Sequence, residues 1–267
     1  MCQIISIANQ KDGVGKTTLN LGTDLALKGF KVLLIDLEPQ ANLSSYLGFE
    51  WDGKLTISHL MLCSHIVFNL TGITDIPAEE FSKFIRTSEE NKISYIPADT
   101  NLANVESYMM NELSREPEMV LKRILKRENL KNYDYVLVDC LPSLGILLIN
   151  ALTASDKIII PVQTQKFAFE GLTSLTELCK QIQETINKNL TLAGVLATMA
   201  DNTNMSKSTL DMLHTKYKGL MFSTVIHKSV EAANSTIRNK SLCLNKTKLG
   251  AEYIALAEEV TGRCKKC

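Results

Sequence analysis

The sequence predicts an α/β fold, a mostly parallel, twisted β-sheet with helices on both of its faces. Three observations carry this prediction. Short, uninterrupted apolar runs recur along the 267 residues and alternate with helical patterns, as in parallel sheets that are covered on both sides. A Gly-rich stretch directly follows the first run, and two later runs end in aspartate. Because ligands of such sheets bind at the carboxyl ends of the strands, these features should meet at one edge.

The elements can be assigned in order. A first strand is expected at 4–8, and a helix should begin near Lys16, with Leu21, Leu25 and Ala26 on its buried face. Gly29 fits the C-terminal cap of that helix. Residues 50–90 show only short mixed patterns, typical of small helices or loops. Further strands are expected at 31–36, 93–97, 135–140, 157–162, 192–198 and 223–226, and further helices at 104–126, 170–185 and 251–260.

The composition is that of an ordinary globular protein, with 45% hydrophobic and 22% charged residues. We find no repeat or linker, so residues 1–267 are interpreted as a single domain. The N-terminus lacks the basic region of a signal peptide, and the apolar stretch 141–152 is too short to cross a bilayer. Seven scattered cysteines, an odd number, argue against a disulfide framework and for a reducing compartment. A cytoplasmic protein without membrane attachment is expected.

Charge is balanced overall but unevenly distributed. The chain has 29 Lys and Arg and 29 Asp and Glu. Between residues 203 and 250, however, there are eight basic residues and only two acidic ones, Asp211 and Glu231. Such a segment is a candidate surface for a polyanion. The alternative is a solvated helical face. The eight basic residues are Lys207, Lys216, Lys218, Lys228, Arg238, Lys240, Lys246 and Lys248.

The Gly-rich stretch has the chemistry of a phosphate-binding P-loop. Residues 9–18 read NQKDGVGKTT. The glycines allow backbone N–H groups to converge on phosphate oxygens in front of a helix N-terminus. Lys16 would reach the β- and γ-phosphates, and the Thr17 hydroxyl would ligate Mg²⁺. The first glycine of the usual motif is replaced by Gln10, and a second lysine, Lys11, stands five residues before Lys16.

Acidic residues end two of the predicted strands. Asp36 and Glu38 follow the second strand, and Asp139 follows four apolar residues of a later one. A carboxylate beside a P-loop can hold Mg²⁺ or orient a water for attack on the γ-phosphate. We therefore expect Asp139 to be a metal-side residue, the alternative being that each aspartate caps a following helix.

Taken together, these segments resemble a known family. Residues 9–18, 34–40 (LIDLEPQ) and 138–145 (VDCLPSLG) are similar to the deviant Walker A, A′ and B boxes of the ParA/Soj partition ATPases, within the ParA–MinD superfamily. The similarity continues through 150–152, 160–163, 170–172, 224–226 and 250–252, and so covers nearly the whole chain.

The resemblance implies a P-loop NTPase that hydrolyses ATP, with ATP and Mg²⁺ as cofactors. It implies an ATP-bound sandwich homodimer that binds double-stranded DNA without sequence specificity on the bacterial nucleoid. A ParB-like centromere-binding partner would stimulate hydrolysis. Lys11 would cross to the partner subunit's phosphates, Glu38 would be the hydrolytic carboxylate and Asp36 its supporting acid. The nucleotide would contact Lys11, Asp12, Gly13, Val14, Gly15, Lys16, Thr17, Thr18 and His227, and DNA would contact Lys216, Lys218, Lys228, Arg238 and Lys240.

The sequence departs from the family pattern in and beside the expected active site. Asp12 replaces a glycine, which adds negative charge where the triphosphate binds and bulk where two subunits meet. Glu38 replaces an aspartate, Leu141 the first proline of the B box, and His227 a proline near the adenine. The helix after Thr18 is two residues shorter, which rotates later side chains by roughly 200°. An ATP-binding regulator with impaired hydrolysis or dimerisation is therefore the alternative function.

Two further alternatives concern the C-terminus. A MinD-like membrane ATPase would need a basic amphipathic helix there, whereas residues 251–260 are amphipathic and acidic, which indicates a packing helix. Cys264 and Cys267 form a C-x-x-C pair that could supply two iron–sulfur ligands, but the motif stands alone at a chain end.

Overall fold

One sheet of seven strands organises the protein. The computed structural model describes residues 2–9, 15–111, 114–165, 168–232, 239–244 and 247–264. Along the sheet the strands are ordered β3-β4-β2-β5-β1-β6-β7, and every neighbouring pair is parallel except β3 with β4. The strands are β1 (Gln3–Ile7), β2 (Val32–Leu37), β3 (Arg86–Ser88), β4 (Ile93–Ile96), β5 (Tyr135–Cys140), β6 (Lys157–Gln163) and β7 (Thr191–Thr198).

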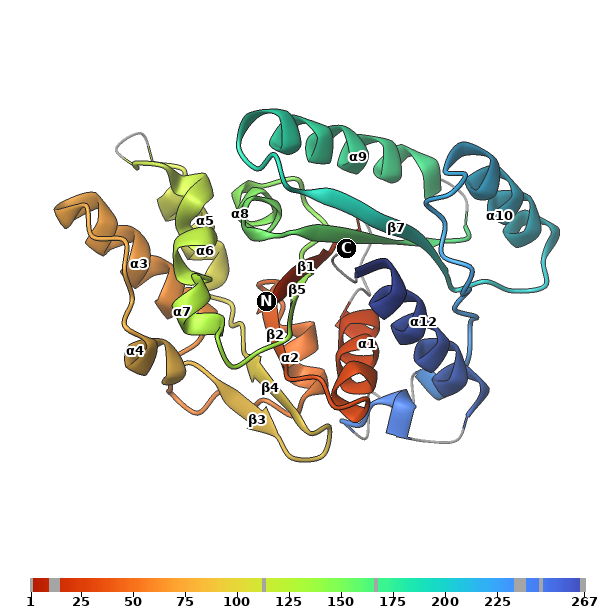
Figure 1. Ribbon diagram of the computed structural model, residues 1–267, viewed down its shortest axis with the longest axis horizontal. Helices are drawn as coiled ribbons and strands as arrows, with labels where there is room; N and C mark the ends of the chain where they lie inside the picture. The colour runs from red at the N-terminus through yellow and green to blue at the C-terminus, as the bar shows by residue number, and fades with distance from the viewer. Residues whose placement is uncertain are drawn as a thin grey trace.

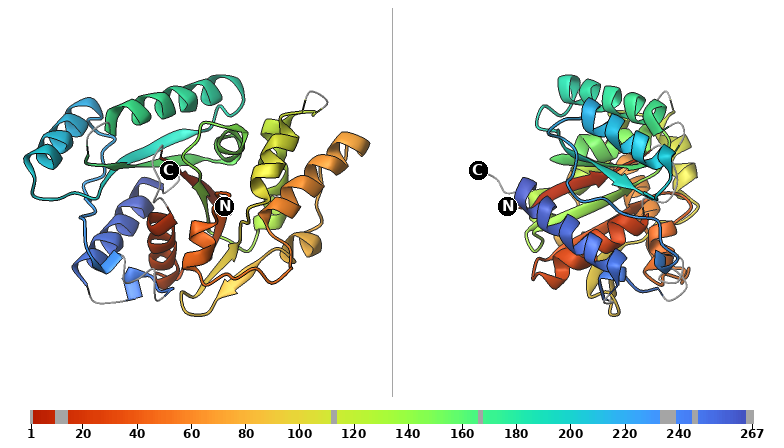
Figure 2. Two further views of the ribbon diagram at one scale, coloured as in Figure 1. Left: turned by 180° about the vertical axis from the view of Figure 1, so that it is seen from behind. Right: turned by 90° about the vertical axis from the view of Figure 1, so that its right-hand side faces the viewer.

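Helices cover both faces of the sheet (Figure 1). The two further views show the same arrangement: α1 and α12 lie side by side on one face of the sheet, and α8 and α9 lie on the other (Figure 2). The helices are α1 (Gly15–Leu27), α2 (Asn42–Tyr46), α3 (Ile57–Thr71), α4 (Ala78–Ser82), α5 (Leu102–Met109), α6 (Val120–Ile124), α7 (Arg127–Leu130), α8 (Ile146–Ala154), α9 (Ala168–Thr185), α10 (Asn204–Lys216) and α12 (Lys248–Cys264), with 3-10 turns η1 (Pro117–Met119) and η2 (Leu242–Leu244).

The central strands are buried on both sides, which explains their uninterrupted apolar sequences. In β5, Val136 and Val138 belong to the hydrophobic cluster under α6, α8 and α9. Tyr135 and Leu137 belong to the cluster under α1 and α12. Successive side chains of a strand point to opposite faces, so a strand covered twice has no polar side. The predicted fold class is confirmed.

Most predicted elements are confirmed within a few residues. Gly29 ends the first helix with a positive φ of 91°, a conformation that glycine adopts without steric cost. Leu21 and Leu25 are fully buried, and Ala26 packs partly buried against the same cluster. The unassigned region 50–90 contains α3, α4 and the short edge strand β3.

Two predicted elements are wrong. The helix expected at 104–126 is divided into α5, η1 and α6, with Pro117 at the start of η1. Proline lacks an N–H and clashes with the preceding turn, so it begins a helical segment instead of continuing one. The strand expected at 223–226 does not form, because the N–H groups of Ser223 and Thr224 donate to the Glu259 carboxylate. Isolated bridges at Met221 and His227, with backbone hydrogen bonds of Phe222 and Ile226, link this stretch to β7 and the residues after it without forming a continuous strand.

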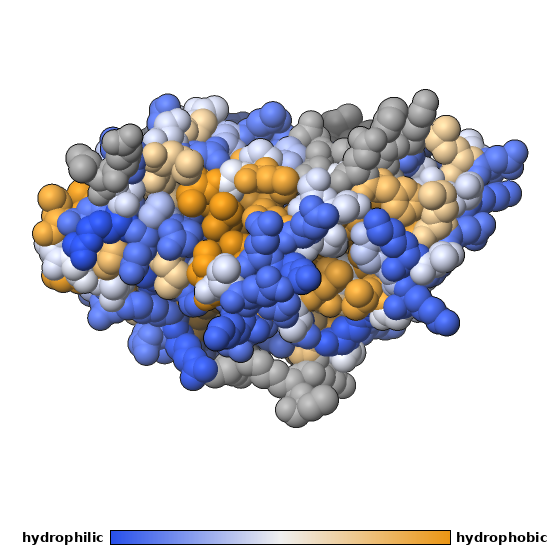
Figure 3. All heavy atoms as spheres, turned by 90° about the horizontal axis from the view of Figure 1, so that it is seen from above, coloured by the Kyte–Doolittle hydropathy of each residue, from blue (hydrophilic) through white to orange (hydrophobic). Residues whose placement is uncertain are grey.

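The C-terminal helix packs as predicted. Seven residues of α12 are buried, and they face α1 and the sheet. Within the described residues, no helix is both long and apolar enough to cross a bilayer. The face seen from above carries separate apolar patches divided by hydrophilic residues (Figure 3).

Candidate functional site

Sheet register brings the predicted acidic residues together. Asp36 of β2 lies directly opposite Asp139 of β5, and Asp139 lies opposite Ile7 of β1. The strand that leads to the P-loop therefore neighbours β5, and β5 neighbours β2. Asp36 and Asp139 are each 1% exposed and Glu38 is 7% exposed. Three carboxyl groups thus meet at the carboxyl edge beside the start of α1.

Asp36 organises the turn that follows β2. Its Oδ1 accepts a hydrogen bond from the Glu38 N–H at 3.1 Å. Its Oδ2 accepts bonds from the Ser44 N–H at 2.8 Å and the Ser44 hydroxyl at 2.7 Å. Glu38 in turn accepts a bond from the Asn42 amide at 2.9 Å. Both oxygens of Asp36 are therefore engaged, which suits a supporting role rather than contact with a nucleotide.

Burial and like charge raise the pKa of both aspartates. Desolvation raises the pKa of Asp36 to about 6, against the opposing hydrogen bonds from Ser44 and Glu38. Desolvation, followed by the neighbouring charge of Asp36, raises the pKa of Asp139 well above its usual range. A cluster of this kind stabilises a cation, because a positive charge offsets both effects.

In the first turn of α1, the hydroxyl that contacts the acidic cluster is that of Thr18 and not the expected one of Thr17. Thr18 Oγ1 donates to Asp139 Oδ1 at 2.5 Å. Thr17 is buried, and its side chain is hydrogen-bonded to the Tyr253 hydroxyl of α12. Adjacent helical residues point about 100° apart, so both threonines cannot face one carboxylate. The structure thus pairs Asp139 with Thr18, and the metal roles predicted for Thr17 and Asp139 stay predictions.

Lys16 is turned toward α2. Its ammonium donates to the Tyr46 hydroxyl at 3.1 Å and lies 4.8 Å from the centre of the Tyr46 ring. Its backbone carbonyl accepts from the Asn20 amide at 2.7 Å. Asn20 also receives bonds from Ser241 and Leu242, which ties the start of α1 to η2.

A cavity of about 220 Å³ opens beside Lys16 and Thr17. Its lining is mixed, with apolar groups from the sheet edge and α12 and polar groups from the loop at His227, which suits a base and sugar next to a phosphate site. His227 is held by Glu252 of α12, whose oxygens are 2.8 Å from the His227 backbone nitrogen and 2.8 Å from Nδ1. The other lining residues are Asn9, Pro161, Gln163, Thr198, Met199, Ile226, Ala232, Leu249 and Tyr253.

The residues present fit Mg²⁺ held jointly with a nucleotide. Among the described residues, no three His, Cys, Asp or Glu side chains are grouped to hold a metal ion alone. Mg²⁺ is typically bound by one or two carboxylates, a hydroxyl and substrate phosphates, rather than by a complete protein cage. Asp139 with a threonine hydroxyl of α1 supplies such a partial set.

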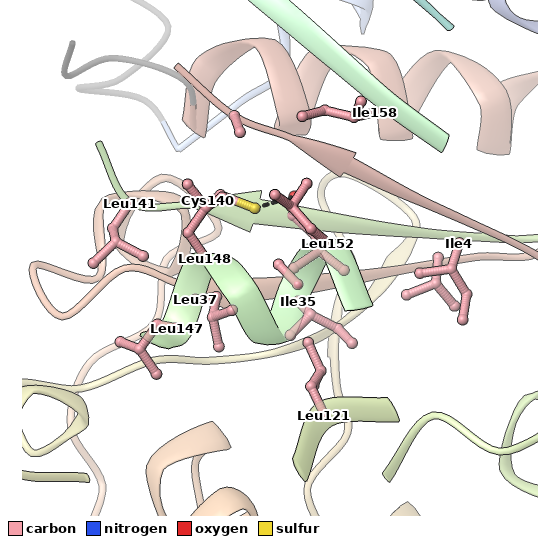
Figure 4. Packing of buried hydrophobic residues seen from close by; sticks show 14 of the residues in the cluster. Ile4, Ile35, Leu37, Leu121, Cys140, Leu141, Leu147, Leu148, Leu152 and Ile158 are labelled. Carbon is pink, nitrogen blue, oxygen red and sulfur yellow. Dashed lines mark hydrogen bonds between the residues drawn. The ribbon is translucent and has the colours of Figure 1, made fainter. Parts of the chain in front are cut away.

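The unexpected Leu141 of the B box has a structural role. It is 6% exposed and belongs to the cluster between the sheet and α8. Leu141 and Cys140 extend toward Leu147 and Leu148 of α8 (Figure 4). The thiol of Cys140 lies 3.6 Å from the Val138 carbonyl, and burial raises the pKa of Cys140 far above its usual range. This box is thus anchored by packing.

Several predicted residues lie outside the described part of the chain. They are Lys11, Asp12, Gly13 and Val14 of the P-loop, Arg238 of the basic segment, and Cys267. Gly15 is the first residue of α1. Cys264, the other half of the C-x-x-C pair, is 3% exposed in the cluster under α12.

The four described lysines predicted to contact DNA are spread over the end of α10 and separate loops. Lys216, at the end of α10, donates to the Thr173 hydroxyl at 3.1 Å. Lys218 follows it on an exposed turn. Lys228 is exposed. Hydrogen bonds from Thr203 lower the pKa of Asp201, and the charge of Lys228 lowers it further. Lys240 pairs at 2.5 Å with Glu90, which lies between β3 and β4. These two strands are far from α10 in Figure 1.

Sequence reasoning missed the side chains that support the site. Asn42, Ser44 and Tyr46 follow the A′ box but match no general motif, and Tyr253 belongs to a helix predicted only to pack. The nearest available signal was their position just after Glu38, at a strand end that carries ligands. Tyr253 offers no such signal, since it reaches the site only through the packing of α12 on α1.

Comparison with known proteins agrees with this geometry. A family model described as AAA domain matches residues 2–192. The chain is 38% identical over 265 residues to the sporulation initiation inhibitor protein Soj of Bacillus subtilis, with 97% of this chain and 98% of that protein covered. It is 33% identical over 267 residues to the chromosome partitioning protein ParA of Caulobacter vibrioides, with 98% and 94% covered. A cobyrinic acid a,c-diamide synthase from Mycobacterium smegmatis, solved with ADP and magnesium, superposes with a TM-score of 0.77 at 28% identity, over 97% of this chain and 93% of that one. The chain therefore belongs to the ParA/Soj family of partitioning ATPases.

Proposed function

We propose that this protein is a DNA-partitioning ATPase that binds ATP with Mg²⁺, dimerises around the nucleotide and then binds DNA without sequence specificity. A ParB-like centromere-binding partner stimulates hydrolysis and so releases the DNA, in the bacterial cytoplasm at the nucleoid. One observation carries the proposal: three buried carboxyl groups lie at the carboxyl edge of the sheet, where Thr18 in the first turn of α1 donates to Asp139. Relatives named Soj and ParA support it.

Each group of the site has a task in this scheme. Lys16 would neutralise the β- and γ-phosphates, and Asp139 with a threonine hydroxyl of α1 would hold Mg²⁺. Mg²⁺ would supply charge neutralisation at the phosphate oxygens. Glu38, bound through Asn42, would orient the attacking water, and Asp36 would hold the turn that carries Glu38. Lys11 would reach the partner subunit's phosphates.

The decisive experiment measures DNA binding as a function of nucleotide. Anisotropy of a labelled random-sequence duplex is titrated with protein under ATP, ADP and no nucleotide, each at two salt concentrations. We expect binding only with ATP, and binding that weakens steeply with salt because several phosphates are neutralised. An Asp139→Asn variant is the matched control, since it preserves size but removes the metal-side charge. Binding that is equal in all three nucleotide states would contradict the proposed switch.

The alternative is an ATP-binding regulator with impaired hydrolysis or dimerisation. The contact between Glu38 and Asn42 favours it, because a buried glutamate fixed by an amide is restricted in where it can hold a water. ATP turnover with DNA and partner, compared between the natural protein, Glu38→Asp and Asp12→Gly, separates the two. A large gain in either variant supports the regulator, and substantial turnover in the natural protein excludes it.

A further inference from the structure

The short helix α2 connects three separate parts of the site. Asn42 donates a hydrogen bond to Glu38 at 2.9 Å, and Ser44 donates two to Asp36. The Tyr46 hydroxyl accepts a hydrogen bond from the Lys16 ammonium. Asn42 and Tyr46 are four residues apart and share one helix face, whereas Ser44 points to the sheet. Leu43 and Leu47, 0% and 6% exposed, fix α2 to the core.

Tyr46 holds Lys16 by two distinct interactions. The hydroxyl accepts a hydrogen bond at 3.1 Å, and the ring face lies 4.8 Å from the ammonium, within the range of a cation–π contact. Lys16 forms no ion pair with a described residue, so Tyr46 is its principal side-chain partner in that part of the chain. The same ammonium would otherwise be directed at phosphate.

We infer that Tyr46 is a positioning residue that competes with nucleotide phosphate for Lys16. In the nucleotide-free protein Tyr46 keeps the ammonium on α2. Phosphate then displaces the phenol, since the Lys16 ammonium gains an ion pair with an anion in place of a hydrogen bond to a neutral hydroxyl. This inference rests on the nucleotide binding of the proposed function and adds the control exerted by Tyr46.

Competition predicts that weakening the contact tightens nucleotide binding. If only a fraction of the free protein has Lys16 available, the measured affinity is reduced by that fraction. We expect Tyr46→Ala to bind ATP about 3- to 10-fold more tightly. Tyr46→Phe, which keeps the ring and loses the hydroxyl, should gain about 2- to 3-fold.

The measurement is calorimetric titration of the full chain with ATP, ADP and AMP. AMP has no β-phosphate for Lys16 to bind, so its affinity should not change in either variant. Tyr108→Phe is the matched control, because Tyr108 is a partly exposed tyrosine of α5 that packs against the His65 ring instead of Lys16. A role of Tyr46 in folding alone would change all three affinities together.

The outcomes are distinguishable. If the natural protein binds ATP and both Tyr46 variants bind it equally or more weakly, the inference is overturned and the proposed function stands. Equal changes for AMP and ATP also overturn it. If neither the natural protein nor a variant binds ATP, both the proposed function and the inference fail. Tighter binding of ATP and ADP, with AMP unchanged, supports the competition.

Discussion

The acidic site and the basic C-terminal segment are built in opposite ways. Asp36 and Asp139 are neighbours because two adjacent strands hold them in register, and both are almost completely buried. Lys216, Lys228 and Lys240 are spread over a helix end and two loops, at least partly exposed, and near different polar partners. The first region is determined by the sheet, and the second by which surface groups happen to be close.

This difference determines how each region should respond to substitution. A residue fixed by strand register has few alternative positions, so its loss changes the chemistry directly. A surface lysine contributes charge that neighbouring lysines can partly replace, and salt screens it. We therefore expect large, specific effects at the acidic edge and small, additive effects in the basic segment.

The largest effect is expected from Lys16→Ala. Lys16 is the only charged side chain among the described residues of the P-loop. Its removal deletes charge-assisted bonds to phosphate, so ATP affinity should fall about 100-fold or more. Fluorescence titration with a labelled ATP analogue measures it. Lys28→Ala is the control, since Lys28 follows α1 and pairs with Glu258 away from the site. Tight ATP binding by Lys16→Ala would mean that the nucleotide site lies elsewhere.

Asp139→Asn should have two effects of opposite sign. Without metal near pH 7.5, it removes a buried charge whose pKa is raised by burial and by Asp36, so unfolding free energy should rise by about 1 kcal/mol. With Mg²⁺ and ATP, the variant should gain far less stability than the natural protein. Thermal unfolding with EDTA or with Mg²⁺ and ATP measures both. Asp99→Asn is the control, because hydroxyls of Thr56 and Ser58 hold Asp99 and its substitution should only destabilise.

Much of the acidic site could be predicted from sequence, and its support could not. An apolar run that ends in aspartate gives both the strand and the edge at which Asp36 and Asp139 lie. The contacts of Thr18 with Asp139 and of Lys16 with Tyr46 depend on how α1 is rotated about its axis, which motif spacing does not specify. The strand predicted at 223–226 failed for a related reason, since Glu259 satisfies its backbone from a helix distant in sequence.

A smaller effect, dependent on pH, is expected from Glu259→Gln, which loosens the anchor of the basic segment. Burial alone would raise the pKa of Glu259, but N–H donors from Ser223 and Thr224 and the Arg263 guanidinium outweigh it and lower that pKa. A lowered carboxyl pKa stabilises the fold above the unfolded value and loses this effect as pH falls through the folded value. The substitution should therefore cost about 1 kcal/mol at pH 7, because the amide cannot accept all of these bonds.

That cost should shrink as pH is lowered below the usual glutamate range and through the lower pKa of folded Glu259, because the natural carboxyl group then becomes protonated as well. Urea unfolding at pH 7 and at about pH 3, below the usual glutamate range, measures it. Glu258→Gln, a neighbour with an exposed side chain, should change stability little at either pH. An equal cost at both pH values would mean that the charge of Glu259 does not contribute.

The smallest effects are expected from single lysines, and they distinguish the two regions most clearly. If Lys218 contacts DNA phosphate, Lys218→Ala should weaken ATP-dependent binding about 2- to 3-fold and lower the slope of log affinity against log salt by about 1. Lys240→Ala should do less, because Glu90 already neutralises that charge near the β3–β4 hairpin. Lys54→Ala, outside the segment and paired with Asp52, is the control for loss of charge alone. Anisotropy at three salt concentrations gives each slope. Equal slopes for Lys218→Ala and Lys54→Ala would show that the uneven charge of the sequence reflects only a solvated surface, and the DNA contacts would then have to be sought in other parts of the chain.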